Sequence, residues 1–324
     1  FWGDEYLTFW LTEPLLTLGE ITEKTLSSPD FVPPFYYYIL NLYNYYFEYS
    51  AYFLRLFHII FGSSSLIITF LISKLLLNKS GSNLVLYLLA FNLFLVWSST
   101  EVRVVSFVLF FQLFSIYIFL MCIKNLQNNY NYTNSFFLFI INLLILTIHP
   151  LSVVIVASQF LFILILIIFK KYVSKGKNFY IHLSSILLAM IFYVILNNSY
   201  IFSSIETTRL DNHNQLNLNF FLGYNFKHYF SLYILGFLNL LLIIFAFISC
   251  RKKFFQNINL LFLFIILILT YLFIIFGTIF LTGMNGQRYW SYLVPLITII
   301  NIYYLTKIKT NTLSKIIIFF IIFY

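Results

Sequence analysis

The stretch from Val102 to Ile123 reads VRVVSFVLFFQLFSIYIFLMCI, and segments of this kind decide the class of fold. A helix needs roughly 20 apolar residues to cross the hydrocarbon core of a bilayer. This stretch supplies that length with a single charged residue, Arg103, near its start. Similar segments recur at about 51–73, 84–97, 136–149, 151–169, 179–196, 231–250, 258–280, 288–306 and from 316 onward. The sequence therefore predicts an all-α polytopic membrane protein with about ten transmembrane helices.

The composition supports this class. Of the 324 residues, 61% are hydrophobic and only 9% are charged, whereas about 25% of the residues in a soluble domain are charged. The net charge of +9 does not indicate a nucleic-acid partner, because the basic residues sit in short clusters between apolar runs. Cys122 and Cys250 cannot form a disulfide framework. The chain begins without Met and ends inside an apolar run, so we expect truncation at both ends and a further helix before Phe1.

The distribution of charge predicts the orientation of the helices. Pro150 separates the segments 136–149 and 151–169, which form either a hairpin or one kinked helix. With a hairpin, and with residues 1–50 outside, 13 of the 19 basic residues fall in inner connections and all ten acidic residues fall outside. This arrangement follows the positive-inside rule. A single kinked helix would place the cluster Arg251–Lys253 outside, so the hairpin is favoured.

These assignments predict one transmembrane domain over residues 1–324, with a helix bundle at 51–324. Two long loops lie on its outer face, residues 1–50 and about 197–230. Long polar loops on one face of a bundle usually carry function. The first loop holds six of the ten carboxylates, so we expect it to contribute to the functional site.

Two motifs stand out in the first loop. Asp4-Glu5 is an acidic pair at the rim of the bilayer, where a carboxylate can act as a general base toward a hydroxyl group; the pair can equally mark a solvated helix end. The second motif is Pro29-Asp30-Phe31-Val32-Pro33-Pro34-Phe35-Tyr36-Tyr37. Its paired prolines fix an extended segment and end any helix before them. Its aromatic residues suit either an interfacial anchor or a functional loop.

Three arginines lie near the outer ends of predicted helices. Arg55 is inside its span, and an ionisable group at that depth is a functional candidate by default; we expect an outer acid such as Glu48, or a phosphate, as its partner. Arg103 follows Glu101 at the mouth of one helix, and Arg288-Tyr289 opens another. A guanidinium at such a place can bind a phosphate through two hydrogen bonds. The alternative is that these arginines pair with acids or belong to an aromatic belt.

Other motifs are less informative. His149, in Thr147-Ile148-His149-Pro150, is placed at the outer rim, where a structural histidine is the favoured interpretation. No His, Cys and Asp cluster has the spacing of a zinc site. The absence of a P-loop and of a G-x-G-x-x-G motif argues against nucleotide hydrolysis by this chain.

Taken in order, the motifs resemble those of GT-C glycosyltransferases that use polyprenyl-phosphate sugars. Protein O-mannosyltransferases and lipid A aminoarabinose transferases belong to this group. The resemblance covers most of the chain through short motifs: Asp4-Glu5, Asp30 with Pro33-Pro34, Arg55, Glu101-x-Arg103, Thr147-x-His149, and Arg288-Tyr289 with Pro295. The chain departs from the pattern at Val32, where some members carry Lys.

The resemblance implies a role for each matching residue. Asp4 would be the catalytic acid that removes a proton from the acceptor, and Glu5 would be its acidic neighbour. Asp30 and Tyr37 would line the substrate cavity. The remaining substrate-binding positions would be Arg55, Arg103, His149, Arg288 and Tyr289, with the arginines near the donor phosphate.

The resemblance also implies the setting of the reaction. The donor would be a polyprenyl-phosphate sugar, the acceptor a hydroxyl of a lipid, glycan or protein, and the chain an integral protein of the plasma (inner) membrane with its active face outside the cytoplasm. It leaves a divalent metal open. A transporter of lipids or solutes and a non-catalytic subunit of a membrane complex are the alternatives. A transporter would show helices broken at mid-membrane in related positions of two halves, and the ten glycines form no such pair.

Overall fold

The computed structural model describes residues 3–28, 32–124, 132–169, 177–198, 257–280 and 287–307, with a few positions between 229 and 248. Helices make up these ranges almost completely, and no strand occurs within them, which confirms the all-α class. The helices, with two short 3-10 helices, are α1 (Gly3–Leu11), α2 (Leu18–Ser27), α3 (Pro34–Tyr46), α4 (Ala51–Lys74), α5 (Lys79–Ala90), α6 (Leu93–Thr100), α7 (Val105–Lys124), α8 (Tyr132–Ile148), η2 (Pro150–Ser152), α9 (Val153–Phe169), α10 (Lys177–Leu196), α14 (Ile258–Phe280), η4 (Gln287–Trp290) and α15 (Leu293–Lys307).

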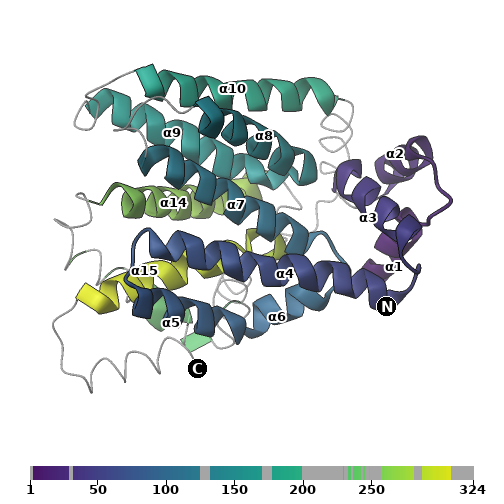
Figure 1. The fold of residues 1–324 in the computed structure, drawn as a ribbon, viewed down its shortest axis with the longest axis horizontal. Helices are drawn as coiled ribbons and strands as arrows, with labels where there is room; N and C mark the ends of the chain where they lie inside the picture. The colour runs from purple at the N-terminus through teal and green to yellow at the C-terminus, as the bar shows by residue number, and fades with distance from the viewer. Residues whose placement is uncertain are drawn as a thin grey trace.

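The longer helices form one bundle. Figure 1 shows α4, α7, α8, α9, α10, α14 and α15 running beside one another. Five helical segments are long and apolar enough to cross a bilayer: Ala51–Lys74, Val105–Lys124, Pro150–Ile168, Phe179–Leu196 and Ile258–Phe276. These match five of the expected spans. The helices α8 and α15 are apolar but shorter than a span. The expected spans 231–250 and from 316 onward lie largely or wholly outside the described residues, so the count of ten stays a prediction.

The expected span 84–97 is a bent pair of helices. The axes of α5 and α6 meet at 58°, and together they are long and apolar enough for one broken span. No glycine or proline lies at the break, and Asn92 accounts for it instead. The Asn92 side chain accepts a hydrogen bond from the backbone N–H of Leu95 at 3.0 Å, and donates to the carbonyl of Tyr229 at 3.1 Å. An Asn that caps a new helix competes with continuation of the previous one.

The segments on either side of Pro150 form a hairpin, as expected. His149 precedes η2, which turns the chain between α8 and α9. The side chain of Asn142, in α8, donates to Gln159, in α9, at 2.6 Å. Both also bond Ser115 of α7, at 2.7 and 2.8 Å. Asn142 and Gln159 could not meet across a single kinked helix, because residues 17 apart are separated by roughly 25 Å along a helix.

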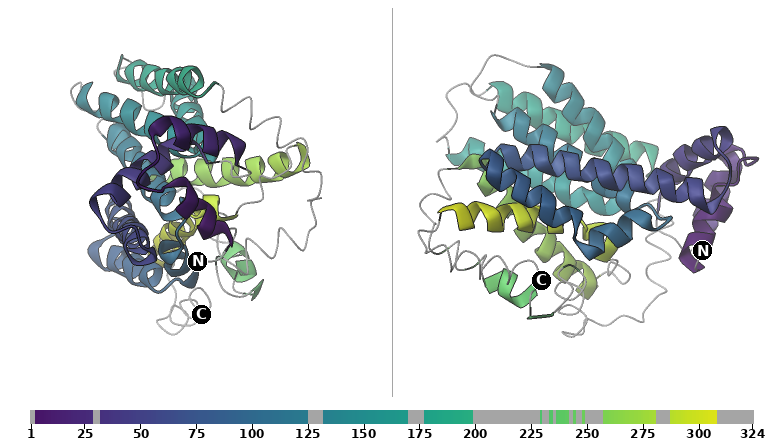
Figure 2. Two further views of the ribbon diagram at one scale, coloured as in Figure 1. Left: turned by 90° about the vertical axis from the view of Figure 1, so that its right-hand side faces the viewer. Right: turned by 60° about the horizontal axis from the view of Figure 1, so that its bottom comes forward.

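Residues 1–50, expected as an outer loop, are largely helical. The side chains of Thr17 and Glu20 form a reciprocal capping box at the start of α2, which satisfies N–H groups that the helix leaves open. Pro33 is extended, as its sequence predicts, but Pro34 begins α3, since a proline at the first helical position loses no hydrogen bond. Figures 1 and 2 show α1, α2 and α3 gathered at one end of the bundle.

A separate apolar core attaches these three helices to the bundle. Side chains of α1, α2 and α3 pack with residues at the start of α4, the start of α7 and the end of α8. Its members are Leu11, Ile21, Val32, Tyr36, Tyr37, Leu40, Leu54, Phe57, Val102, Val104, Phe107, Val108 and Ile148. Polar contacts add to it, including a hydrogen bond from the Asn44 amide to the carbonyl of Thr12 at 2.9 Å. The N-terminal helices are therefore a fixed part of the fold.

Candidate functional site

Residues 101–104, between α6 and α7, form the centre of a polar cluster at the end of the bundle that carries α1, α2 and α3. These four residues are all buried. Arg103 belongs to this segment, and four other residues singled out in the sequence lie around it: Glu5, Arg55, His149 and Arg288. These four come from α1, α4, the α8–η2 turn and η4. The fold thus brings together positions that are separated along most of the chain.

Glu5 attaches α1 to this segment. Its side chain is 2% exposed, and one carboxylate oxygen accepts a hydrogen bond from the backbone N–H of Val102 at 3.0 Å. The other oxygen pairs with Arg55 at 3.1 Å. Arg55 is therefore paired with an acid of the predicted outer face, as expected, and that acid is Glu5. The Arg55 side chain remains 43% exposed, so it reaches the surface of the cluster.

Glu101 holds Arg288 in a similar way. The two side chains form an ion pair at 2.8 Å, with Glu101 2% and Arg288 22% exposed. The guanidinium of Arg288 also lies over the ring of Trp97, 5.3 Å from its centre, at the distance of a cation–π contact. Pairing with an acid was one alternative for Arg288, and the structure contains that pair. Both carboxylates of the cluster are buried, whereas Arg55 and Arg288 reach its surface.

Arg103 and His149 occupy the interior of the cluster. Arg103 is 7% exposed and His149 is 2% exposed. The Nδ1 atom of His149 accepts a hydrogen bond from the backbone N–H of Leu151 at 3.3 Å, which stabilises the turn into η2. Burial and, as the smaller cause, the positive charge of Arg103 together lower the pKa of His149 to about 3. His149 is therefore neutral at physiological pH.

Tyr37 is buried in α3, and its neighbour Tyr36 makes a contact that sequence reasoning missed. The rings of Tyr36 and Tyr37 are 5.0 Å apart and meet edge to face. The Tyr36 hydroxyl lies 2.7 Å from Nε2 of His58, which is completely buried in α4. A histidine within a predicted span is an unusual feature, and this signal was available for His58. The pair attaches α3 to α4 beside the cluster.

The side-chain positions of three expected site residues are not described. Asp4 belongs to α1 and Tyr289 to η4, and only their backbone is described; Asp30 lies outside the described residues. The roles of Asp4, Asp30 and Tyr289 stay predictions. Within the described ranges, no three His, Cys, Asp or Glu side chains lie close enough to hold a metal ion.

The charges of the described side chains favour an anion. Arg55, Arg103 and Arg288 contribute three positive charges, and Glu5 and Glu101 contribute two negative ones, with His149 neutral. These five described side chains therefore sum to one excess positive charge. A guanidinium that is already positioned by a carboxylate can bind an additional anion with little loss of side-chain freedom. The arrangement is suited to a phosphate group.

Comparison with solved structures shows the class of fold. An archaeal oligosaccharyltransferase, AglB from Archaeoglobus fulgidus, in complex with an inhibitory peptide and a dolichol-phosphate, superimposes with a TM-score of 0.62 over 98% of this chain at 10% identity. An oligosaccharyltransferase of the same organism in its apo form gives a TM-score of 0.55 over 86% of the chain at 13% identity. No family model and no curated protein sequence matches the chain.

The likeness supports the GT-C resemblance of the sequence motifs in general and does not distinguish one subtype from another. At 10–13% identity it shows that the chain shares the fold of these oligosaccharyltransferases, and it shows the fold alone. The chain spans about half the length of the structures it matches, 50% in the dolichol-phosphate complex and 42% in the apo form. The donors and acceptors of those proteins therefore apply to this chain only as a proposal.

Proposed function

We propose that this protein is a membrane glycosyltransferase that moves a sugar from a polyprenyl-phosphate donor to a hydroxyl acceptor. One observation carries the proposal: at one end of a GT-C bundle, Arg55 and Arg288 reach the surface while the carboxylates that hold them are buried. A phosphate can therefore approach two positioned guanidinium groups. The polyprenyl chain would lie against the apolar helices within the bilayer.

The described residues have distinct roles in this proposal. Arg288 and Arg55 bind the phosphate of the donor, and Arg103 adds positive charge from the interior of the cluster. Glu101 and Glu5 are positioning residues, because each holds one of the two exposed guanidinium groups. His149 shapes the turn behind Arg103 as a neutral group. Tyr37 supports α3 beside the cluster, and Asp30 and Tyr289 are further candidates for contact with the substrate.

Asp4 is the proposed general base, with Glu5 as its acidic neighbour. Its carboxylate removes the proton from the acceptor hydroxyl as the oxygen attacks the anomeric carbon. The bond between that carbon and the phosphate oxygen breaks, and its electron pair stays on the phosphate. The arginines stabilise the negative charge that develops on this leaving group. Because Glu5 attaches α1 to Val102, it fixes the backbone that carries Asp4.

The comparison supports the class of donor. One of the similar structures contains a dolichol-phosphate, which is a polyprenyl phosphate, and a peptide. Because this chain shares the fold, we propose that its donor is also lipid-linked. The acceptor is a hydroxyl of a lipid, glycan or protein. The sequence pattern of basic inner connections supports an outer active face of the plasma (inner) membrane.

Replacing Asp4 tests this function. We expect Asp4→Asn to lower the rate of sugar transfer by about a hundredfold to ten-thousandfold, the usual contribution of a general base, while the protein remains folded. The matched control is Glu23→Gln, which neutralises an exposed carboxylate of α2 and should keep its activity. A folded Asp4→Asn variant with normal turnover would exclude this base. If the unchanged protein transfers no sugar, a measured transport of lipids or solutes would favour the transporter. Assembly into a membrane complex without transfer would favour the non-catalytic subunit.

A further inference from the structure

The connection between α3 and α4 carries four aromatic side chains of which half or more is exposed. They are Tyr45, Tyr46, Phe47 and Tyr52, and we call them the aromatic turn. Over residues 31–54 the sequence contains twelve aromatic residues, eight Tyr and four Phe, and one charged residue, Glu48. Exposed apolar patches of this kind mark sites of interaction with a membrane or with another protein.

Contacts on both sides stabilise the aromatic turn. The ring of Phe47 stacks on Tyr43 of α3, with the ring centres 4.5 Å apart. The Tyr43 hydroxyl donates to the carbonyl of Phe53 in α4 at 3.0 Å. Tyr49 stacks on Phe9 of α1 and donates to its carbonyl. The exposed rings are therefore presented by an ordered backbone, and an ordered surface loses little conformational freedom when it binds.

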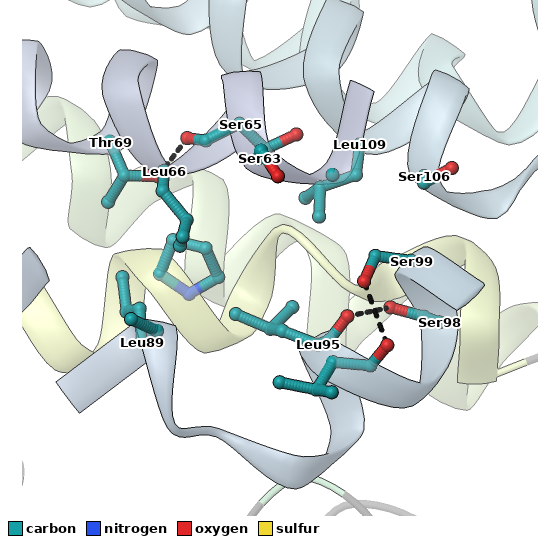
Figure 3. Close-up of a pocket in the computed structure, with 14 residues that line it drawn as sticks. Ser63, Ser65, Leu66, Thr69, Leu89, Leu95, Ser98, Ser99, Ser106 and Leu109 are labelled. Atoms are coloured by element: carbon teal, nitrogen blue, oxygen red, sulfur yellow. Dashed lines mark hydrogen bonds between the residues drawn. The ribbon is translucent and has the colours of Figure 1, made fainter. Parts of the chain in front are cut away.

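The exposed side of α4 indicates what the aromatic turn meets. α4 is long and apolar enough to cross a bilayer. Its exposed large apolar side chains are Tyr52, Ile59, Ile60 and Ile67. These four lie within about 100° of one another around a helix with 3.6 residues per turn. On the opposite side of α4, Ser65 and Thr69 are buried and face the α5–α6 pair (Figure 3). The exposed stripe therefore faces lipid, and Tyr52 joins it to the aromatic turn.

The length of α4 places the aromatic turn at the edge of the bilayer. Lys74 ends the helix and marks one interface. The hydrocarbon core is about 30 Å thick, which a helix crosses in about 20 residues, so its other edge lies near Leu54. Tyr52 and the residues before it then lie at the level of the lipid headgroups. Tyr is enriched at that level, because its ring is apolar and its hydroxyl can hydrogen-bond to headgroups and water.

We propose that the aromatic turn docks on the lipid headgroup region at the end of the bundle that carries α1, α2 and α3. The partner is the lipid surface itself, bound through apolar area and tyrosine hydroxyls. Glu48 offers no attraction to anionic lipids, so the docking does not depend on salt. Arg55 follows Tyr52 by three residues, or about 4.5 Å of helix. The docking thus fixes Arg55 at the level of lipid phosphate groups, and it does not require the proposed transfer reaction.

Spin labels that report depth in the bilayer test the proposal. The full chain, with Cys122 and Cys250 replaced by Ala, is reconstituted in phosphatidylcholine vesicles. A nitroxide is attached at one of three positions, in the variants Tyr46→Cys, Tyr52→Cys and Ile59→Cys. Collisions with oxygen, which concentrates in lipid, and with a nickel chelate, which stays in water, give the depth of each label. Glu23→Cys, at an exposed position of α2, is the control for a label in water.

We expect the labels at Tyr46→Cys and Tyr52→Cys to lie at the headgroup level, and the label at Ile59→Cys about 10 Å deeper, the rise of seven helical residues. High salt should leave these depths unchanged. Replacing Tyr45, Phe47 and Tyr52 together by Ser should bring the Ile59→Cys label closer to water by at least the rise of one residue, about 1.5 Å.

Three results would overturn the proposal. A Tyr46→Cys label as accessible to the nickel chelate as the Glu23→Cys label would show that the aromatic turn lies in water. A label shielded from both reagents would show that protein covers the turn, either a second copy of this chain or another partner. An unmoved Ile59→Cys label in the triple Ser variant would show that the turn does not fix the height of α4. Sugar transfer is not measured, so these results are separate from the proposed function.

Discussion

The carboxylate of Glu5 accepts a hydrogen bond from the backbone N–H of Val102, a residue 97 positions later in the chain. The same carboxylate pairs with Arg55. Through these two bonds α1 is joined both to α4 and to the segment that opens α7. The carboxylate of Glu5 is thus directed into the protein and not into solvent.

Glu5→Ala should loosen this attachment. It removes the acceptor for a buried backbone N–H and the partner of Arg55, so we expect a loss of about 1–3 kcal/mol of unfolding free energy. Arg55 is 43% exposed, and water will partly replace its lost partner. Thermal unfolding in detergent measures the effect. Glu13→Ala, at an exposed position of the same region, is the control, and equal unfolding of the two variants would contradict the role of Glu5.

Arg288→Lys separates phosphate binding from simple ion pairing. Lysine keeps the charge and can still pair with Glu101, but it lacks the planar guanidinium. We expect the affinity for a polyprenyl-phosphate donor to fall by about 1–3 kcal/mol, with unfolding nearly unchanged. Arg103→Lys should act in the same direction. Lys24→Gln, which removes a cation that lies over Trp10, is the control. Unchanged donor binding in both arginine variants would refute the phosphate assignment.

The neutral state of His149 predicts a dependence of stability on pH. Its folded pKa of about 3 lies below the ordinary value of 6.5, so the unfolded chain binds more protons between these values. Stability should therefore fall as the pH falls below 6.5. At pH 5 the contribution is about 2 kcal/mol. His149→Gln should remove this contribution, so the unfolding free energy of the variant should depend less steeply on pH below 6.5 than that of the unchanged protein. Parallel profiles of unfolding free energy against pH for the two proteins would contradict this prediction.

Gly62→Ala should disturb the contact between α4 and α6. A Cβ atom at Gly62 would clash with Cβ of Ser99 and lie 3.4 Å from its Cα. Overpacking of this kind costs about 1–3 kcal/mol. Adding Ser99→Gly should restore part of the loss, and a double-mutant cycle of unfolding free energies measures this coupling. Gly19→Ala, where the nearest atom is 4.0 Å away, is the control. Simple additivity of the two changes would argue against the contact.

The sequence was sufficient for the class of fold, because the length of an apolar segment is a local property. The span expected at 102–123 corresponds to α7, and the one at 51–73 to α4. The hairpin at Pro150 could also be predicted, since charge on the flanking segments distinguishes the two orientations. The helices within residues 1–50 were missed. Their apolar faces are short, and they are stabilised by packing on the bundle that no local pattern reveals.

The candidate site was only partly predictable for the same physical reason. Arg55 stands out because a charge inside an apolar span is costly, but its partner Glu5 lies 50 positions away. Nothing local indicates that pairing. The bend between α5 and α6 depends on the side chain of Asn92, and one asparagine among many in this chain gave no distinct signal. The sequence identified single residues whose chemistry is unusual for their position. Which of these residues pair with one another could be seen only in the tertiary structure.

The bonds among Ser115, Asn142 and Gln159 have a consequence for biosynthesis. The three residues belong to consecutive helices, and the most distant two are 44 positions apart. Contacts over short separations close with a small entropic cost and form early. Because a chain is made from its N-terminus, α7, α8 and α9 are complete before α14 and α15 are synthesised. These three helices can fix their relative rotation and height at that stage, and the later helices then insert beside an assembled unit.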